Sequence, residues 1–172
     1  RMALEDSGIS QEEVAEKGGR VAVTIGTANA GFGTLVDISY QYTIHGRKPF
    51  PTSLINGLPN MPAYYVSLEM GATGPLTTIS TACASGTQSI GHAMELILLG
   101  KADMVFAGGV DCLVREEVMV AFDAMTVLAR SNNASPEKAS RPFDTNREGF
   151  VLGEGAGIFV LESLEHALQR DA

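Results

Sequence analysis

The chain of 172 residues has the length of one ordinary domain, and its 45% hydrophobic and 19% charged residues exclude a disordered, collagen-like or coiled-coil protein. The formal net charge is −8 and the basic residues form no run, which argues against nucleic acid or an anionic membrane as a partner. No apolar run reaches the ~18 residues of a membrane span and no signal peptide is evident, so we expect a cytoplasmic protein.

Strands and helices alternate in the predicted secondary structure. In chain order we predict a helix end at 2–7, a strand at 21–27, helices at 35–44 and 62–70, a strand at 77–81, a helix at 84–99, a strand at 102–107, a helix at 116–128, a strand at 157–162 and a helix at 163–170. Gly71 is predicted to end the second of the early helices. This alternation indicates an α/β layer architecture.

The composition of three segments allows a closer interpretation. The glycine-rich stretch 26–33 matches neither GxGxxG nor a Walker loop, so we interpret it as a backbone turn beside a pocket rather than a phosphate site. Residues 49–59 form a proline-punctuated loop. The helix at 84–99 combines spaced apolar residues with small ones, which predicts burial on nearly all sides.

Cys83 is the residue best placed for chemistry. It follows a predicted strand and precedes a helix that opens with small residues, the layout of a nucleophile elbow. A helix N-terminus favours an anion, which would help a thiolate and a nearby oxyanion. Pattern alone leaves open the alternative that Cys83 is a small buried hydrophobe. Cys112 has no such helix opening directly after it and is interpreted as structural.

The three histidines are weak partners for a cysteine nucleophile. His92 lies nine residues into the helix after Cys83, about 13 Å along the axis, too far for direct proton transfer. We interpret it as a packed or capping residue. His45 and His166 are expected to be exposed on the surface. Any catalytic partner of Cys83 is therefore expected outside this chain.

Three sequence blocks resemble the β-ketoacyl-[acyl carrier protein] synthases that elongate fatty acids. They are residues 81–91 (TACASGTQSIG), 100–109 (GKADMVFAGG), and 139–144 (ASRPFD) running on to 147–157 (REGFVLGEGAG). The resemblance implies a thiolase-like αβαβα fold in which residues 1–172 form most of the first of two similar halves. Because the chain begins at Arg1 rather than Met, we interpret it as an excerpt of a longer polypeptide, and the resemblance implies that the opening strand would lie before Arg1 and the second half after Ala172. The resemblance also implies a homodimer.

The same resemblance assigns roles to individual residues. Cys83 would accept an acyl group from acyl carrier protein, and its backbone N–H would form part of the oxyanion hole. Phe122 and Phe150 would line the acyl pocket, and Asn29 would stand at its far end, where relatives carry a small or aliphatic residue. A buried Asn29 amide should bond locally or face a polar acyl group. The two catalytic histidines would lie in the second half, and no metal or organic cofactor is implied.

The sequence leaves alternative functions open. A chain-length-factor-like partner subunit would share the fold but commonly lacks the cysteine that is present here. A thiolase is disfavoured by the Arg-Pro-Phe-Asp and Gly-Glu-Gly-Ala-Gly blocks, whereas a polyketide ketosynthase is not separable from a fatty-acid enzyme. Because carrier proteins are acidic, we expect a local basic patch, with Arg47, Lys48 or Arg130 as candidates. Residues 1–172 alone are expected not to catalyse condensation.

Overall fold

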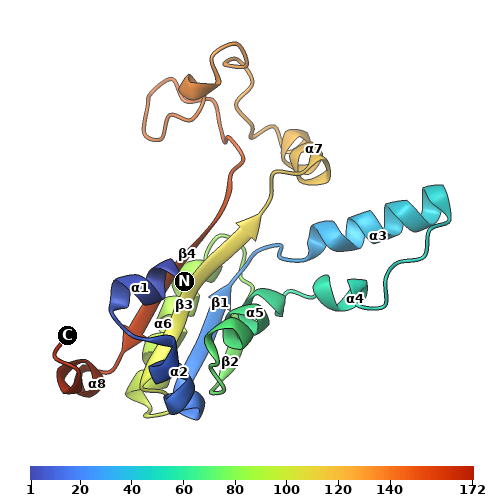
Figure 1. Ribbon diagram of the computed structural model, residues 1–172. Helices are drawn as coiled ribbons and strands as arrows, with labels where there is room; N and C mark the ends of the chain where they lie inside the picture. The colour runs from blue at the N-terminus through green and yellow to red at the C-terminus, as the bar shows by residue number, and fades with distance from the viewer. The chain divides into compact units, whose positions relative to one another are not determined.

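The computed structural model describes residues 1–172, which divide into two compact units. The sheet unit comprises Arg1–Asp111 and Ala156–Ala172, and the loop unit comprises Cys112–Gly155. The elements, shown in Figure 1, are α1 (Met2–Ser7), α2 (Gln11–Lys17), η1 (Gly18–Arg20), β1 (Val21–Gly26), α3 (Phe32–His45), α4 (Ser53–Asn56), α5 (Met61–Met70), β2 (Leu76–Ile79), α6 (Ser85–Leu98), β3 (Met104–Cys112), α7 (Glu116–Ala124), η2 (Pro136–Lys138), β4 (Glu154–Glu162) and α8 (Leu164–Gln169).

The sheet has the strand order β2-β1-β3-β4. β1 is parallel to both neighbours, with Val23 opposite Leu76 on one side and Phe106 on the other. β4 runs antiparallel to β3: the N–H of Ser163, just after the end of β4, donates to the carbonyl of Asp103, just before the start of β3. Every residue of β1 is buried, as expected for a central parallel strand covered on both faces.

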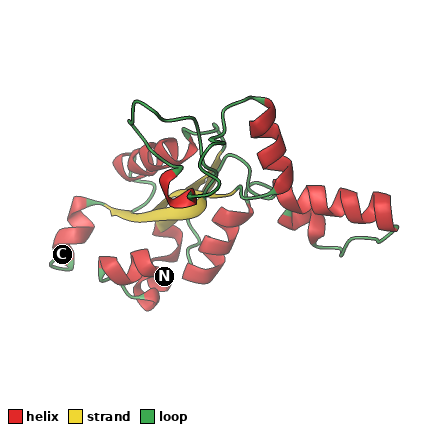
Figure 2. Ribbon diagram, turned by 90° about the horizontal axis from the view of Figure 1, so that it is seen from above, coloured by secondary structure: helices red, strands yellow, loops and turns green.

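Helices cover both faces of this sheet (Figure 2). On one face α1, α2 and α5 pack over the side chains of Val23, Ile25 and Phe106. On the other face α6 packs through Ala93 and Leu96 against the alternate residues of β1 and β3. The α/β layer architecture predicted from the sequence is therefore confirmed for the sheet unit.

Helix ends follow the expected local chemistry. Gly71 adopts the left-handed conformation after α5, with φ 74°, as predicted for a helix C-terminus. The side chains of Ser10 and Ser163 accept backbone N–H groups in the first turns of α2 and α8. These serines define where short helices begin, and α2 was not among the elements predicted from the sequence.

Two sequence-based predictions are wrong in this chain. Helix α6 is not buried nearly all round, because Met94 and Leu98 are 54% and 75% exposed; one side packs on the sheet and the other is open. His166 is not a surface residue, since only 5% of it is exposed. Its Nδ1 lies 2.6 Å from Glu162 Oε2 and its Nε2 lies 3.3 Å from Glu13 Oε1. The burial of His166 involves Glu13 of α2, a contact that the local pattern of the C-terminal helix does not predict.

The loop unit contains α7, η2 and the segment 139–153. The N–H of Phe150 donates to the carbonyl of Val127 at 2.7 Å, and Ala129 donates back to Phe150, which joins the two sides of the loop. The Glu148 carboxylate accepts both the N–H and the hydroxyl of Ser131, and these bonds hold the Glu148 pKa below its usual value. The predicted helix at 116–128 ends earlier, at Ala124.

Candidate active site

Cys83 lies in a tight turn between β2 and α6. β2 ends at Ile79, α6 begins at Ser85, and the Cys83 thiol is free and exposed. The preceding Ala82 adopts a left-handed conformation with φ 52°, which is uncommon for a residue with a side chain. The alternative of a small buried hydrophobe does not describe Cys83 in this structure. The thiol is accessible at the N-terminal end of a fourteen-residue helix.

Ser85 holds the turn together from inside. Its side-chain oxygen accepts the backbone N–H of Thr81 at 2.8 Å. Its hydroxyl lies 2.7 Å from the carbonyl of Ala82 and 3.2 Å from the carbonyl of Thr27, although one proton serves one acceptor at a time. Only 2% of Ser85 is exposed, so these bonds replace water at a buried site.

Glycines allow α6 to begin directly against the sheet. A Cβ atom on Gly26 would overlap the backbone carbonyl of Ser85, and one on Gly109 would lie 3.1 Å from the Cα of Gly86. The end of β1, at Gly26, and Gly109 within β3 therefore meet the first turn of α6 backbone to backbone. This contact places Cys83 at the carboxyl edge of the parallel strands, where α/β sheets bind their ligands.

The glycine-rich turn after β1 is bound by a carboxylate of the chain itself. Asp111 Oδ1 accepts the Thr27 hydroxyl at 3.0 Å and the N–H of Asn29 at 2.9 Å, and Oδ2 accepts the N–H of Ala28 at 3.0 Å. These N–H groups are the ones a phosphate would need, so the structure favours the backbone-turn interpretation. Thr27 and Asp111 carried no functional signal in the sequence.

The three residues predicted to line the acyl pocket fall in different parts of the chain. Asn29 lies exposed in the turn after β1. β1 is the neighbour of β2, the strand that leads to Cys83. Phe122 and Phe150 belong to the loop unit and contact each other edge to face, with ring centroids 6.5 Å apart. Phe150 is 60% exposed. Their role in substrate binding stays a prediction.

None of the three histidines is paired with Cys83. His92 Nδ1 lies 3.5 Å from Glu95 Oε2, and His45 packs edge-on against Tyr40. His166 is held between two carboxylates, as described above. His, Cys, Asp and Glu side chains nowhere gather in threes in a way that could bind a metal ion. None of the helices has the length and apolar character of a membrane-spanning segment.

Cys112 differs from Cys83 in its surroundings. Its Sγ donates a hydrogen bond to Glu154 Oε2 at 3.1 Å, and this bond together with the negative charge of Glu154 raises the pKa of the Cys112 thiol. A raised pKa leaves less thiolate at neutral pH, which is unfavourable for a nucleophile.

The chain is similar to known condensing enzymes over its full length. It is 42% identical over 172 residues to 3-oxoacyl-[acyl-carrier-protein] synthase 2 of Vibrio cholerae, covering 99% of this chain and 41% of the relative. It is 39% identical to the ketoacyl synthase alpha subunit of the tetracenomycin polyketide synthase of Streptomyces glaucescens, covering 100% of this chain and 41% of the relative. The chain thus spans about two fifths of the curated relatives.

Solved structures show the same relationship. A type II polyketide synthase acyl-carrier protein in complex with its ketosynthase bound to the hexaketide matches with a TM-score of 0.90 and 31% identity, over 99% of this chain and 43% of that chain. A β-ketoacyl synthase from Burkholderia phymatum matches with a TM-score of 0.81 and 33% identity, over 99% of this chain and 41% of that chain. The family model for the N-terminal domain of β-ketoacyl synthase matches residues 1–167. The chain therefore belongs to the β-ketoacyl synthase family, in the part that forms the N-terminal domain.

Proposed function

We propose that the protein containing this chain is a β-ketoacyl-acyl carrier protein synthase in which Cys83 carries the growing acyl group. The observation that carries this proposal is the exposed Cys83 thiol in the strained turn before α6. The family assignment supports it, because the chain matches the N-terminal domain of β-ketoacyl synthase and relatives named 3-oxoacyl-[acyl-carrier-protein] synthase 2.

The first step is transfer of an acyl group to Cys83. The Cys83 sulfur attacks the carbonyl carbon of an acyl thioester, a new C–S bond forms, and the carbonyl oxygen becomes an oxyanion. Collapse of this intermediate expels the sulfur of the carrier's thiol, which takes up a proton. The first backbone N–H groups of a helix have no partners within the helix, so the start of α6 favours the negative charge. The N–H of Cys83 is proposed as one oxyanion donor.

The second step forms a carbon–carbon bond. Loss of carbon dioxide from a malonyl thioester leaves a carbanion, which attacks the carbonyl carbon of the acyl-Cys83 thioester and releases the Cys83 thiolate. This step needs groups that stabilise the carbanion and its oxygen. The three histidines of residues 1–172 are engaged with Glu95, Tyr40 and the Glu162–Glu13 pair. We infer that the required groups lie outside this chain and that residues 1–172 alone do not catalyse condensation.

We propose fatty-acid elongation as the pathway, with polyketide synthesis as the second candidate. The second candidate is kept because ketosynthases of both pathways match at about 40% identity. The two are distinguished by the substrates accepted. A fatty-acid enzyme is expected to extend saturated acyl chains by two carbons per malonyl thioester. A polyketide ketosynthase is expected to extend chains that keep their keto groups.

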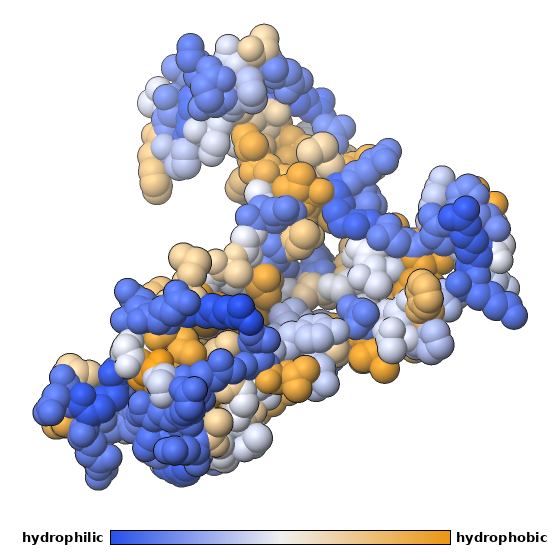
Figure 3. All heavy atoms as spheres, in the orientation of Figure 1, coloured by the Kyte–Doolittle hydropathy of each residue, from blue (hydrophilic) through white to orange (hydrophobic).

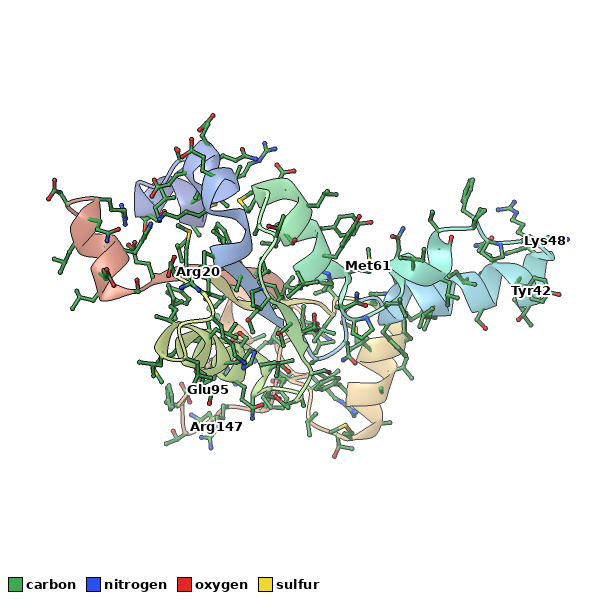
Figure 4. The ribbon with its side chains drawn as sticks, turned by 90° about the horizontal axis from the view of Figure 1, so that it is seen from below. Arg20, Tyr42, Lys48, Met61, Glu95 and Arg147 are labelled. Carbon is green, nitrogen blue, oxygen red and sulfur yellow. The ribbon has the colours of Figure 1, made fainter.

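The proposed partner is an acyl carrier protein, and its proposed docking surface is the basic tip of the α3–α4 arm, at Arg47 and Lys48. We define this arm as residues 32–58, comprising α3, α4 and the loop between them. Arg47 and Lys48 lie in a stretch, 38–68, without a single acidic residue. Figure 4 shows Tyr42 and Lys48 together at the outer end of α3, and Figure 3 shows hydrophilic residues gathered there. Arg130 is a weaker candidate, because its guanidinium already pairs with Asp123 at 2.6 Å.

We also propose that the protein is a homodimer. Neither α3 nor α4 buries a residue in this chain. The apolar side chains of the arm are exposed instead, among them Tyr40, Phe50 and Leu54. An extended apolar surface of this kind marks a protein interface. A second copy is the occupant that the family resemblance implies.

The proposed function is tested by product analysis with the full-length polypeptide. The protein is incubated with an acyl carrier thioester and malonyl carrier protein, and the β-ketoacyl product is measured by mass spectrometry. Formation of a product two carbons longer, absent in Cys83→Ala, supports the proposal. A protein that binds the carriers but forms no product with saturated or keto-containing acyl groups would favour the non-condensing partner subunit.

A further inference from the structure

The carboxylate of Asp111 is the one charged group that organises the turn after β1. It accepts the Thr27 hydroxyl and the backbone N–H groups of Ala28 and Asn29, all within 3.1 Å. Asp111 is separated from these residues by more than 80 positions in sequence. The bonds therefore tie the carboxyl end of β3 to the carboxyl end of β1 across the top of the sheet. Hydrogen bonds to a carboxylate are stronger than those between neutral groups.

Thr27 connects this carboxylate to the turn that holds Cys83. Only 1% of Thr27 is exposed, and its N–H donates to the carbonyl of Ile79 at the end of β2. Its side chain is fixed from two sides, because the hydroxyl donates to Asp111 and accepts the N–H of Ala30 at 2.9 Å. Its carbonyl oxygen lies 3.2 Å from the Ser85 hydroxyl. Thr27 thus contacts Asp111, β2 and the start of α6 at once.

Ser85 completes the connection. The N–H of Thr81 donates to its oxygen, and its hydroxyl faces the carbonyl of Ala82. Both residues immediately precede Cys83, and Ala82 has the left-handed conformation that directs the chain through the turn. A residue with a side chain keeps this conformation only where its surroundings hold it in place.

We propose that Asp111 is a positioning residue that sets the reactive geometry of Cys83 through Thr27 and Ser85. Asp111 does not touch Cys83, and its oxygens are occupied by the turn, so it acts through other residues. The inference rests on the proposed function only in taking Cys83 as the reactive thiol. A displacement of about 1 Å in a reacting group lowers rates by about 100-fold, so a loosened turn has a large kinetic effect.

The test compares Asp111→Ala, Asp111→Asn and Ser85→Ala in the full-length polypeptide. Two rates are measured for Cys83, alkylation by iodoacetamide and acylation by an acyl carrier thioester, each normalised to the titrated number of reactive sites. We expect Asp111→Ala to lower the acylation rate by about 10- to 100-fold, with the KM for the carrier unchanged. Asp111→Asn should recover part of this loss, because the amide oxygen still accepts an N–H.

A matched control is available at the other end of the same strand. Asp103 precedes β3 and forms an ion pair with Arg20, far along the sheet from the turn after β1. Asp103→Asn removes a carboxylate interaction and should lower stability without changing either Cys83 rate. If the Asp111 variants behave like Asp103→Asn, with normal rates per reactive site, Asp111 is merely structural and the inference is wrong.

The route through Ser85 is tested by combining variants. If Asp111 acts through Thr27 and Ser85, the double variant Asp111→Asn/Ser85→Ala should lose less than the product of the two single losses. Independent, fully multiplicative losses would contradict this route. Measuring alkylation and acylation separately also distinguishes the positioning role of Asp111 from the proposed function. Alkylation that depends on Asp111, in a protein that is never acylated, would retain the inference and reject the proposed function.

Discussion

Gly26 and Ser85 approach so closely that a Cβ on Gly26 would overlap the Ser85 carbonyl. β1 therefore ends, and α6 begins, at a contact that only glycine permits. We predict that Gly26→Ala destabilises the fold by about 1–3 kcal/mol, because the backbone has to shift to admit a methyl group. Chemical denaturation of the full-length protein measures the loss. Gly19→Ala is the control, because a Cβ there has no neighbour within 4 Å, and an equal loss in both variants would contradict the account.

The ion pairs around Glu162 predict a pH dependence of stability. Arg170, and to a lesser degree His166, lower the pKa of Glu162 below its usual value of 4.5. A lowered folded-state pKa stabilises the protein above the unfolded pKa, and the contribution is lost as pH falls through the folded value. Glu162→Gln should therefore be less stable than the unmodified protein at pH 7.

The difference between the two proteins should shrink on acidification below pH 4.5. This difference in stability is measured from the denaturation midpoints of both proteins between pH 7 and pH 3. The exposed Glu165, in the first turn of α8, provides the control Glu165→Gln, which should change stability little. A Glu162→Gln protein as stable as the original at pH 7 would show that the Arg170 pair does not contribute.

The two cysteines are predicted to differ in reactivity. Glu154 raises the pKa of Cys112, so Cys112 should be alkylated slowly near neutral pH while Cys83 reacts faster. Glu154→Gln removes the negative charge and should accelerate alkylation of Cys112 without affecting Cys83. Peptide mass spectrometry after timed alkylation distinguishes the two sites. Slower or unchanged labelling of Cys112 in this variant would contradict the assigned cause.

Charge reversal on the α3–α4 arm tests the docking proposal. Lys48→Glu should raise the KM for an acidic acyl carrier protein, about 10-fold at low salt, and the effect should fade as ionic strength rises. The kcat should change little, because Lys48 is placed far from chemistry by the proposal. Arg130→Glu is the comparison, since Arg130 is already paired with Asp123. A larger effect of Arg130→Glu than of Lys48→Glu would move the docking surface to the loop unit.

The sequence predicted the α/β architecture because hydrophobic spacing and glycine positions act locally. The apolar, β-branched run at β1 and the Gly71 helix end are such cases, and both are observed. The partial exposure of α6 is not predictable from the sequence. Small and apolar residues on all sides of a helix predict burial, but they do not identify the segments that would cover each side. His166 was misjudged because its partner Glu13 comes from a helix 153 positions earlier.

The same limit applies to the candidate site. Cys83 was identifiable because a strand, a cysteine and a helix with small residues follow one another within a few positions. Asp111 was not, because its partners Thr27 and Asn29 are more than 80 residues away and no local pattern joins them. The pocket role of Phe122 and Phe150 is implied by the resemblance alone. In the structure the two rings contact each other edge to face.

The most direct test of the central claim is the intact mass of the full-length polypeptide before and after incubation with a fatty acyl carrier protein. The account predicts a gain of one acyl mass, located on Cys83 by peptide mapping and absent in Cys83→Ala. A polypeptide that stays unmodified across several acyl chain lengths, with Cys83 still open to alkylation, would contradict the claim that Cys83 carries the acyl group.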